Sequence, residues 1–403
     1  MAESSSQDKR PLAGVKVLEL GSLIAGPYAG ALFAQFGAEV IKIEPPGVGD
    51  ALRTWRNLHA GTSLWWYVQS RNKKSVSLNL KSDAGRDIVR RLAAEAEVLI
   101  ENFRPGTLEK WGLGWDELSK LNPRLVMVRI SGYGQSGPRR HLPGFAAIAE
   151  GMGGLRHVTG YPDRPPVRAG VSIGDTLASL YGVIGALIAM HHVKAGGEGQ
   201  VVDVALYEAV FAVMESLMPE YSLQGTVRGR TGASLPGISP SNTYLCCDGG
   251  YVIIAANGDA LFKRLMAAIG RHDLADDVTL AHNEGRVARN DELDHAIGAW
   301  AVQHDIDEVI QTLEHAGVPV GKSFTAADIS QDKHYRARSM LEEHNLPAGG
   351  PRVTIPGIVP KLTQTPGETR WLGPKLGEHT AEVLATLGFG SEAFAALRNQ
   401  GVV

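Results

Sequence analysis

Residues 15–44 read VKVLELGSLIAGPYAGALFAQFGAEVIKIE, and the order of apolar and small residues in this stretch indicates the type of sheet. The run 15–20 is short and apolar, as expected of a buried strand, and 40–44 repeats the pattern. Between them, the small and apolar residues 28–36 favour a helix. A strand, a helix and a second strand in so short a stretch form a βαβ unit. We therefore expect parallel strands joined by a right-handed crossover.

The same alternation continues along the first half of the chain. In chain order we expect a strand at 76–80, a helix capped by Ser82 and running to Leu92, a strand at 98–100, helical turns at 107–121, a strand at 125–130, a long helix at 176–191, a strand at 201–204 and a helix at 205–223. This order predicts an α/β fold with a large, open, parallel (Rossmann-like) sheet. Ligands of such sheets bind at the carboxyl ends of the strands.

A second, smaller domain follows. The stretch 225–242 is rich in Gly, Arg, Ser and Pro and reads as a connection. A hairpin at 243–247 and 251–255 and several amphipathic helices then indicate an α+β domain. We expect a large domain at 11–224, the connection and small domain at 225–341, and a C-terminal segment, 342–403, that returns to the large domain with strands at 352–362 and a helix at 378–387.

Composition narrows the class of protein. The chain has 403 residues, 44% of them hydrophobic and 21% charged, and a net charge of -3. These values are typical of a soluble globular protein and do not provide the basic field that nucleic acid requires. The apolar run 173–190 raises the question of a membrane span, but it holds Asp175 and has no partner span, so we expect a buried core helix and no membrane. The two cysteines, Cys246 and Cys247, are adjacent; they exclude an ordinary disulfide, offer no metal site and suit a reducing cytoplasm.

Three loops rich in glycine or proline follow strands of the expected sheet. They are Gly21 to Pro27, Glu101 to Gly106 and Ser131 to Pro138. None matches the dinucleotide fingerprint or the P-loop. Because the carboxyl ends of parallel strands share one edge of a sheet, we expect these loops to form one binding rim.

Asp175 stands at the mouth of the long apolar helix, after Ser172, Ile173 and Gly174. A carboxylate there faces the positive end of the helix dipole and backbone N–H groups that lack helical partners. That setting stabilises its negative charge and fixes its direction, as a carboxylate nucleophile requires. Aspartate is also a favoured N-cap, so this residue alone leaves a structural role open.

Seven segments, in order and with consistent spacing, resemble the class III CoA-transferases, the family of formyl-CoA transferase and carnitine CoA-transferase. They are Ala25-Gly26-Pro27, Val40 to Glu44, Arg71 to Ser75, Glu101 to Gly106, Ser131 to Gly134, Gly174-Asp175 and Leu376 to Thr380. The resemblance extends from Pro11 to Val403. It implies an interlocked homodimer that acts on an acyl-CoA and a carboxylic acid without a prosthetic group. It also implies that Asp175 attacks the donor thioester to give an aspartyl–acyl anhydride and then an aspartyl-CoA thioester.

The resemblance also suggests which residues hold coenzyme A. For the phosphate and adenine end, the candidates are Lys81, Arg104 and Lys110, with Asn79, Asn102 and Phe103 beside them. For the pantetheine channel toward Asp175, the candidates are Ile24, Gly144 and Phe145.

Two positions separate this chain from formyl-CoA transferase. Family members that act on oxalate carry glutamine and tyrosine where this chain has Ile24 and Phe145. The sequences of the motifs are more similar to those of the family branch that moves CoA from succinyl-CoA to dicarboxylates. Arg168, Arg228 and Arg230 are candidates for binding the distal carboxylate of such an acceptor, and the sequence does not choose between them.

Three rival functions deserve comparison. A racemase of the same fold would need a proton-carrying histidine where Phe145 stands. A non-catalytic CoA-binding paralogue would be favoured by loss of the nucleophile, yet Asp175 is present. A hydrolase is suggested by Gly170 to Gly174, which fits G-x-S-x-G. That motif needs a strand before the serine and a helix directly after it, and we expect a loop before and a helix only after Gly174.

Overall fold

The computed structural model describes residues 8–403, which divide into two compact units. Unit 1 holds the residues up to 155 together with 169–218 and 336–403, and unit 2 holds 156–168 and 219–335. The sequence-based division at residue 225 had assigned 156–168 and 219–224 to the first domain.

Unit 1 is built on six parallel strands in the order β5-β2-β1-β6-β7-β8. Their bounds are β1 Lys16–Glu19, β2 Glu39–Glu44, β5 Lys73–Ser77, β6 Val98–Glu101, β7 Val126–Ser131 and β8 Val201–Ala205. The strand order turns at β1: β2 and β5 extend to one side, and the chain then crosses back to place β6, β7 and β8 on the other. The expected open parallel sheet is confirmed, and this turning point is where such folds bind ligands.

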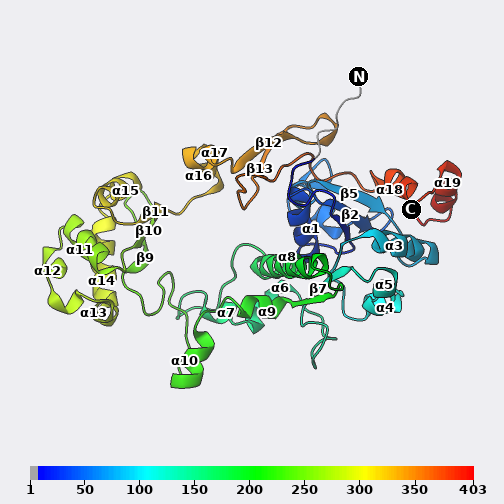
Figure 1. Cartoon of the computed structure of the whole chain (residues 1–403). Helices are drawn as coiled ribbons and strands as arrows, with labels where there is room; N and C mark the ends of the chain where they lie inside the picture. The colour runs from blue at the N-terminus through cyan, green and yellow to red at the C-terminus, as the bar shows by residue number, and fades with distance from the viewer. Residues whose placement is uncertain (1–7) are drawn as a thin grey trace. The chain divides into compact units, whose positions relative to one another are not determined.

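Helices cover both faces of this sheet because its strands alternate in side-chain direction. Val17 packs in a cluster with one set of helices and Leu18 in a cluster with the other. The first face carries α1 Ala25–Gln35, α6 Ala146–Met152, α8 Ile173–Lys194 and α9 Leu206–Phe211. The second carries α3 Asp83–Glu95, α4 Thr107–Lys110, α5 Trp115–Leu121, α18 Thr380–Thr386 and α19 Ser391–Asn399 (Figure 1). Ser82 caps α3 as expected, accepting a hydrogen bond from the N–H of Gly85.

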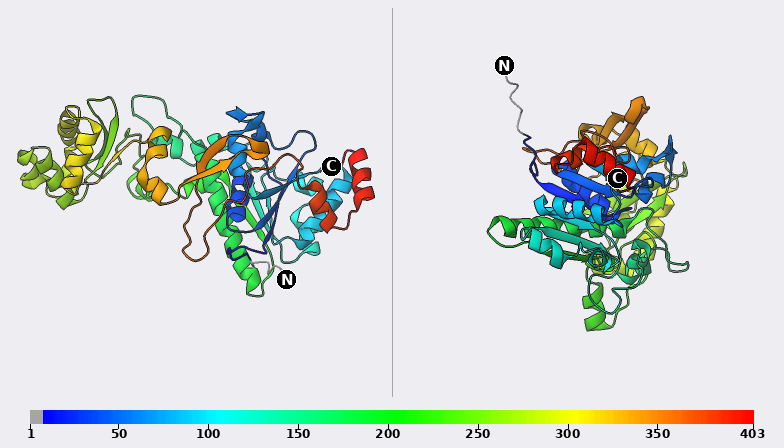
Figure 2. Two further views of the ribbon diagram at one scale, coloured as in Figure 1. Left: turned by 90° about the horizontal axis from the view of Figure 1, so that it is seen from above. Right: turned by 90° about the vertical axis from the view of Figure 1, so that its right-hand side faces the viewer.

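The C-terminal segment returns to this sheet, as Figure 2 shows for the red helices beside the blue and cyan elements. The N–H of His379 donates to the carbonyl of Ser75 at 2.9 Å, and that of Asn79 donates to the carbonyl of Val402 at 2.8 Å. Strands β12 Leu341–Asn345 and β13 Arg352–Pro356 form an antiparallel pair. The expected strand at 352–362 ends at Pro356, and α19 was not foreseen.

Unit 2 is a small α+β unit. Its antiparallel sheet has the order β11-β10-β9, with β9 Ser241–Leu245, β10 Tyr251–Ala255 and β11 Val320–Lys322. Its helices are α11 Asp259–Ala268, α12 His272–Ala275, α13 Asn283–Ala288, α14 Asn290–Ala301, α15 Ile306–His315 and α16 Ala326–Gln331. Cys246 is buried, Cys247 is exposed and both are free thiols.

Short elements complete the described chain. They are η1 Ala51–Thr54, β3 Leu58–His59, β4 Thr62–Ser63, α2 Leu64–Gln69, α7 Leu155–Val158, α10 Leu217–Gln224, η2 Val278–Leu280, α17 Lys333–Ala337 and η3 Pro347–Gly349. The single helix expected at 205–223 was wrong, because α9 ends at Phe211 and α10 begins at Leu217. Pro219 lacks the N–H that a continuing helix would need, and Glu215 has a φ of 52°, outside the helical region.

Helix α8 lies only partly in the core. Its small residues face the sheet: a Cβ at Gly182 would lie 3.2 Å from Val128. On the other side Leu180, Ile184 and Ile188 are exposed. The expectation of a buried core helix therefore holds for one face only. In the described chain, α8 is the one helix long and apolar enough to span a membrane, a criterion that core helices also meet.

Candidate active site

Asp175 is the third residue of α8, which begins at Ile173 after the N-cap residue Ser172. The expectation that the helix starts after Gly174 was therefore wrong, and the alternative role of Asp175 as its N-cap is not realised. Its carboxylate is half-buried in the first helical turn, where the dipole argument still applies. A Cβ at Gly174 would lie 3.2 Å from the Cβ of Ala146, so this turn packs closely on the start of α6.

The helix start also changes one argument about the hydrolase motif. Because α8 begins directly after Ser172, the helix that a nucleophile elbow requires is present, contrary to expectation. The strand that must precede the serine is absent from residues 161–172, all of which the structure describes. The strand–turn–helix geometry of an elbow is therefore not formed.

One turn after Asp175, Ser179 ties α8 to the first loop of the sheet. Its Oγ lies 2.7 Å from the carbonyl oxygen of Asp175 and 2.7 Å from that of Ala25, and the side chain is fully buried. Ala25 is the first residue of α1 and follows the loop after β1. The start of α1 is thereby fixed against the first turns of the helix that carries Asp175.

The loop after β7 also lies beside the start of α8, and its path depends on a close contact between two glycines. A Cβ at Gly132 would lie 2.8 Å from the Cα of Gly144, so neither position has room for a side chain without moving backbone. This contact brings Phe145, the N-cap residue of α6, beside the turn that holds Asp175. The Phe145 ring is 70% exposed.

A pocket of about 320 Å³ opens at the carboxyl edge of β1, β2, β5 and β6, at the turning point of the strand order. Its volume falls in the range of about 300–1,000 Å³ typical of small-molecule sites. Three of the predicted CoA contacts line it: Asn79, Lys81 and Phe103. Phe103 forms an edge-on pair with Trp111, with ring centroids 5.4 Å apart, and both rings belong to the wall.

The cationic candidates occupy different surroundings. Lys81 is exposed at the rim of the pocket. The Asn79 side chain accepts a hydrogen bond from the N–H of Lys81 at 3.0 Å, which shapes the turn that presents this lysine. Arg104 and Lys110 are exposed and lie outside the pocket wall, in the loop after β6 and in α4.

The buried side chain of Glu101 holds the loop after β6 through hydrogen bonds. Its carboxylate accepts from the N–H of Phe103 at 2.7 Å and from Nε of Arg129 at 2.7 Å, and Arg129 also binds Glu109. Burial raises the pKa of Glu101 to about 7, although the adjacent guanidinium opposes the shift. This buried ion pair fixes the backbone that carries Phe103 and Arg104.

Asn102 and Ile24 are engaged inside the protein. The Asn102 side chain accepts from the N–H of Ser22 at 2.8 Å and donates to its carbonyl at 2.9 Å. Ile24 is only 8% exposed and is the N-cap residue of α1. Neither residue belongs to the wall of the pocket. The arrangement gives Asn102 a role in shaping the loop after β1.

Sequence reasoning did not single out Trp111 or three buried polar side chains that bond the loop after β1, namely Lys42, Asp50 and Gln69; of these, Lys42 and Asp50 also line the pocket. Lys42 lies between two isoleucines in β2, and a lysine flanked by apolar residues in a buried strand is itself a signal of a buried partner. The identity of that partner, Asp50, depends on how a loop folds back and is not visible in the sequence.

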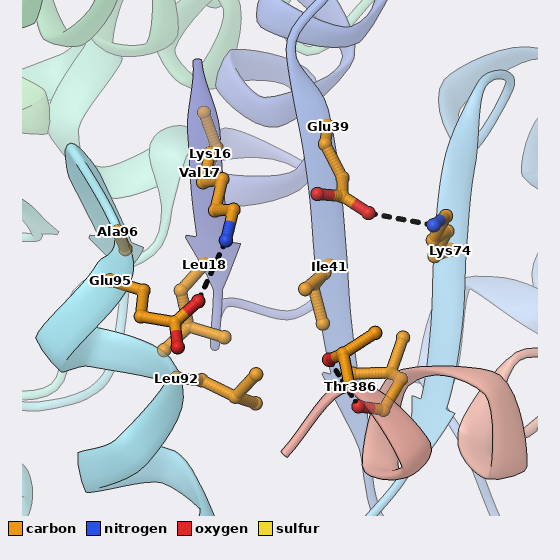
Figure 3. A pocket seen from close by; sticks show the side chains of 11 residues that line it. Lys16, Val17, Leu18, Glu39, Ile41, Lys74, Leu92, Glu95, Ala96 and Thr386 are labelled. Atoms are coloured by element: carbon orange, nitrogen blue, oxygen red, sulfur yellow. Dashed lines mark hydrogen bonds and ion pairs between the residues drawn. The ribbon is translucent and has the colours of Figure 1, made fainter. Parts of the chain in front are cut away.

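A smaller cavity of about 70 Å³ lies toward the amino ends of β1 and β2, away from the pocket described above (Figure 3). Its two lysines are already paired. Lys16 binds Glu95 at 2.7 Å and Lys74 binds Glu39 at 2.6 Å. With its cations neutralised in this way, the cavity offers little to an anionic ligand.

The three arginines considered for the acceptor all belong to unit 2. Arg228 is paired with Glu220, and Nε of Arg230 donates to the carbonyl of Tyr161 at 3.1 Å. Arg168 lies in the irregular segment before α8. Nothing in these surroundings distinguishes one of them as the acceptor ligand.

Unit 1 thus combines a doubly wound sheet, a pocket at the switch point of its strand order and Asp175 in the first turn of α8. Folds of this kind bind their ligands at such a switch point. Comparison with known proteins gives the family. The family model for CoA-transferase family III matches residues 12–380. The chain therefore belongs to CoA-transferase family III, and it is a class III CoA-transferase.

Individual relatives agree with this assignment. The chain is 46% identical to succinyl-CoA–D-citramalate CoA-transferase of Chloroflexus aurantiacus, covering 99% of this chain and 100% of the relative. It is 42% identical to the beta subunit of succinyl-CoA–L-malate CoA-transferase of the same organism, covering 98% of each. The crystal structure of a CAIB/BAIF family protein from Brucella suis matches with a TM-score of 0.82 at 35% identity, covering 94% of this chain and 100% of that one.

Proposed function

We propose that this enzyme transfers CoA from succinyl-CoA to a dicarboxylic acid, with Asp175 as the nucleophile. The observation that carries the proposal is the arrangement within unit 1. Asp175 lies in the first turn of α8, and Ser179, one turn later, contacts the carbonyl of Ala25 at the start of α1, which directly follows the loop that lines the pocket. The choice of substrates is supported by the relatives that use succinyl-CoA with citramalate or malate.

The proposed reaction proceeds through two covalent enzyme species. The Asp175 carboxylate attacks the carbonyl carbon of succinyl-CoA, the C–S bond breaks, and CoA thiolate leaves behind an aspartyl–succinyl anhydride. The thiolate then attacks the aspartyl carbonyl, which releases succinate and leaves CoA joined to Asp175 as a thioester. The acceptor carboxylate repeats these steps in reverse, restoring the aspartate. No proton is gained or lost overall, and the energy of the thioester is kept because water is excluded.

Seven of the nine predicted contacts, together with Trp111, have a direct part in this proposal. Phe103 and Trp111 offer aromatic surface to the adenine, and Lys81 offers a cation to a phosphate at the rim. Arg104 and Lys110 extend this positive charge along the exposed side. The pantetheine arm would follow Ile24, Gly144 and Phe145 toward Asp175.

The proposal includes an interlocked homodimer in the cytoplasm. The exposed apolar side of α8, formed by Leu180, Ile184 and Ile188, supports a protein partner, because monomers rarely leave such a stripe open to water. Free Cys246 and Cys247 are compatible with a reducing compartment.

The experiment is mass spectrometry of CoA esters after incubation with succinyl-CoA and a panel of mono- and dicarboxylic acids. Wild type should form a new acyl-CoA with a dicarboxylate. Asp175→Asn, which preserves side-chain size, should form none. The matched control is Asp116→Asn, which removes an exposed carboxylate from the first turn of α5 in the same unit and should leave transfer unchanged. Substantial transfer by Asp175→Asn would refute the mechanism, and a wild type inactive with every acid would refute the function.

A further inference from the structure

The loop of residues 21–24, which follows β1, is held by side chains from four other parts of unit 1. At its start, Nζ of Lys42 donates to the carbonyl of Gly21 at 2.8 Å. The carboxylate of Asp50 accepts from the N–H of Leu23 at 2.9 Å. Lys42 and Asp50 also pair with each other at 2.8 Å, and both side chains are only 1% exposed.

Two amides hold the rest of the loop. Asn102 binds both the N–H and the carbonyl of Ser22, as described above. Nε2 of Gln69 lies 2.7 Å from the carbonyl of Leu23 and 3.3 Å from that of Ile24. All four residues of the loop thus have backbone groups bonded to polar side chains that lie far from them in sequence.

The loop held by these hydrogen bonds also contains a strained backbone conformation. Leu23 has a φ of 64°, a left-handed conformation that residues with a Cβ rarely adopt. Such outliers persist where the surroundings hold them and are concentrated at functional sites. A loop of this length could relax if its carbonyl and N–H groups were free to bond with water.

The charges beneath the loop form a larger buried network. Lys42 also binds Glu19 at 2.8 Å, and Lys73 binds the other oxygen of Glu19 at 2.7 Å. Desolvation makes buried ion pairs a poor source of stability compared with apolar packing of the same volume. Lys42 and Asp50, the two members of this network that bond the strained loop, are therefore better explained by the geometry that they impose.

The clamped loop connects the two parts of the proposed site. Gly21, Ser22 and Leu23 belong to the wall of the pocket, as do Lys42 and Asp50, whereas Gln69 lies outside it. The next residues begin α1, where the carbonyl of Ala25 accepts the hydrogen bond from Ser179, one turn after Asp175. A shift of the loop would therefore change the position of a ligand in the pocket relative to the carboxylate of Asp175.

We propose that Lys42, Asp50 and Gln69 are positioning residues of the transfer reaction: they hold the backbone of loop 21–24 so that an acyl-CoA bound in the pocket is aligned with Asp175. This inference rests on the function proposed above. It concerns alignment, so it predicts a larger effect on kcat than on the affinity for free CoA.

The test variant is Gln69→Leu, which removes both amide hydrogen bonds at similar volume and leaves every charge in place. Its matched control is Asn122→Leu, because the Asn122 amide likewise donates to two carbonyls, those of Ala93 and Ala96, at the opposite edge of the sheet. The readouts are kcat and KM with succinyl-CoA, the Kd of free CoA by calorimetry, and the melting temperature.

Gln69→Leu should lower kcat by a factor of about 10 to 100, the scale of misplacements near 1 Å, while the Kd of CoA changes by less than about threefold. Asn122→Leu should retain wild-type kcat after a similar loss of melting temperature. If Gln69→Leu does not fold, the same readouts apply to Asp50→Asn, which keeps an acceptor oxygen for the N–H of Leu23 but removes the charge that holds Lys42.

Wild-type kcat in the folded clamp variant would overturn the inference and leave the proposed function intact. An equal loss of kcat in Asn122→Leu would also overturn it, since the effect would then be one of general stability. A wild-type protein that transfers no CoA refutes the proposed function itself, and the inference with it.

Discussion

Gly30 of α1 provides a sharp test of the buried charge network, through the substitution Gly30→Ala. A Cβ placed there would lie 2.0 Å from Oε2 of Glu19 and 3.4 Å from Nζ of Lys73. Neither side chain has room to retreat, because both are fully buried. The added methyl group must therefore displace the Glu19 carboxylate from Lys73, from Lys42 or from both.

Two opposing terms set the magnitude. Replacing glycine by alanine within a helix usually stabilises it by about 1 kcal/mol. Disrupting a buried ion pair so that a charge loses its partner costs about 3–5 kcal/mol. The difference predicts that Gly30→Ala lowers the free energy of unfolding by about 2–4 kcal/mol, although helix propensity alone predicts the opposite sign.

The assay is urea unfolding followed by circular dichroism, with Gly151→Ala as the control. Gly151 lies in α6 of the same unit, and a Cβ there would meet nothing within 4 Å. The control should therefore be neutral or gain up to about 1 kcal/mol. A Gly30→Ala protein as stable as wild type would refute the buried network as described.

Three further predictions concern the charges and loops of unit 1. Burial lowers the pKa of Lys73 from 10.5 to about 8, so the unfolded chain binds more protons than the folded protein between these pH values. The free energy of unfolding of the wild type should therefore rise by about 3 kcal/mol from about pH 8 to about pH 10.5. Urea unfolding should show no such rise in Lys73→Met. A difference in free energy of unfolding between the two proteins that does not change with pH would contradict this prediction. Lys81→Met should raise the Kd of CoA about fivefold and weaken its salt dependence, while Lys120→Met, an exposed lysine of α5, should not; calorimetry at two ionic strengths decides. Gly132→Ala should cost about 1–3 kcal/mol and most of the activity, because its Cβ meets the Gly144 backbone; wild-type transfer rates in that variant would count against the packing of this loop.

The sheet could be predicted from sequence because periodicity reports which residues are buried. The strand near Val40 and the cap at Ser82 follow from local patterns, and both agree with the structure to within a few residues. Helix ends were less predictable. The start of α8 at Ile173 was missed because glycine at position 174 argues locally against a helix, whereas the tight packing on Ala146 favours it.

The candidate site could be predicted only as a set of motifs. Phe103 and Lys81 were assigned to one ligand by resemblance, and the structure brings both to one pocket. The hydrogen bonds that hold loop 21–24 were not predictable, because Asp50 and Gln69 reach this loop only once the intervening chain has folded. The sequence shows that Lys42 lies between two isoleucines in a strand, but not which carbonyl it binds.

In the proposed mechanism Asp175 carries CoA during transfer. The most direct measurement is intact-protein and peptide mass spectrometry after incubation with succinyl-CoA alone, quenched in acid. The proposed mechanism predicts a mass gain of one CoA less one water on the peptide that contains Asp175. This adduct should disappear when a dicarboxylate acceptor is added and should be absent from Asp175→Asn. Transfer that proceeds without any adduct, or with CoA attached to another residue, would contradict the claim.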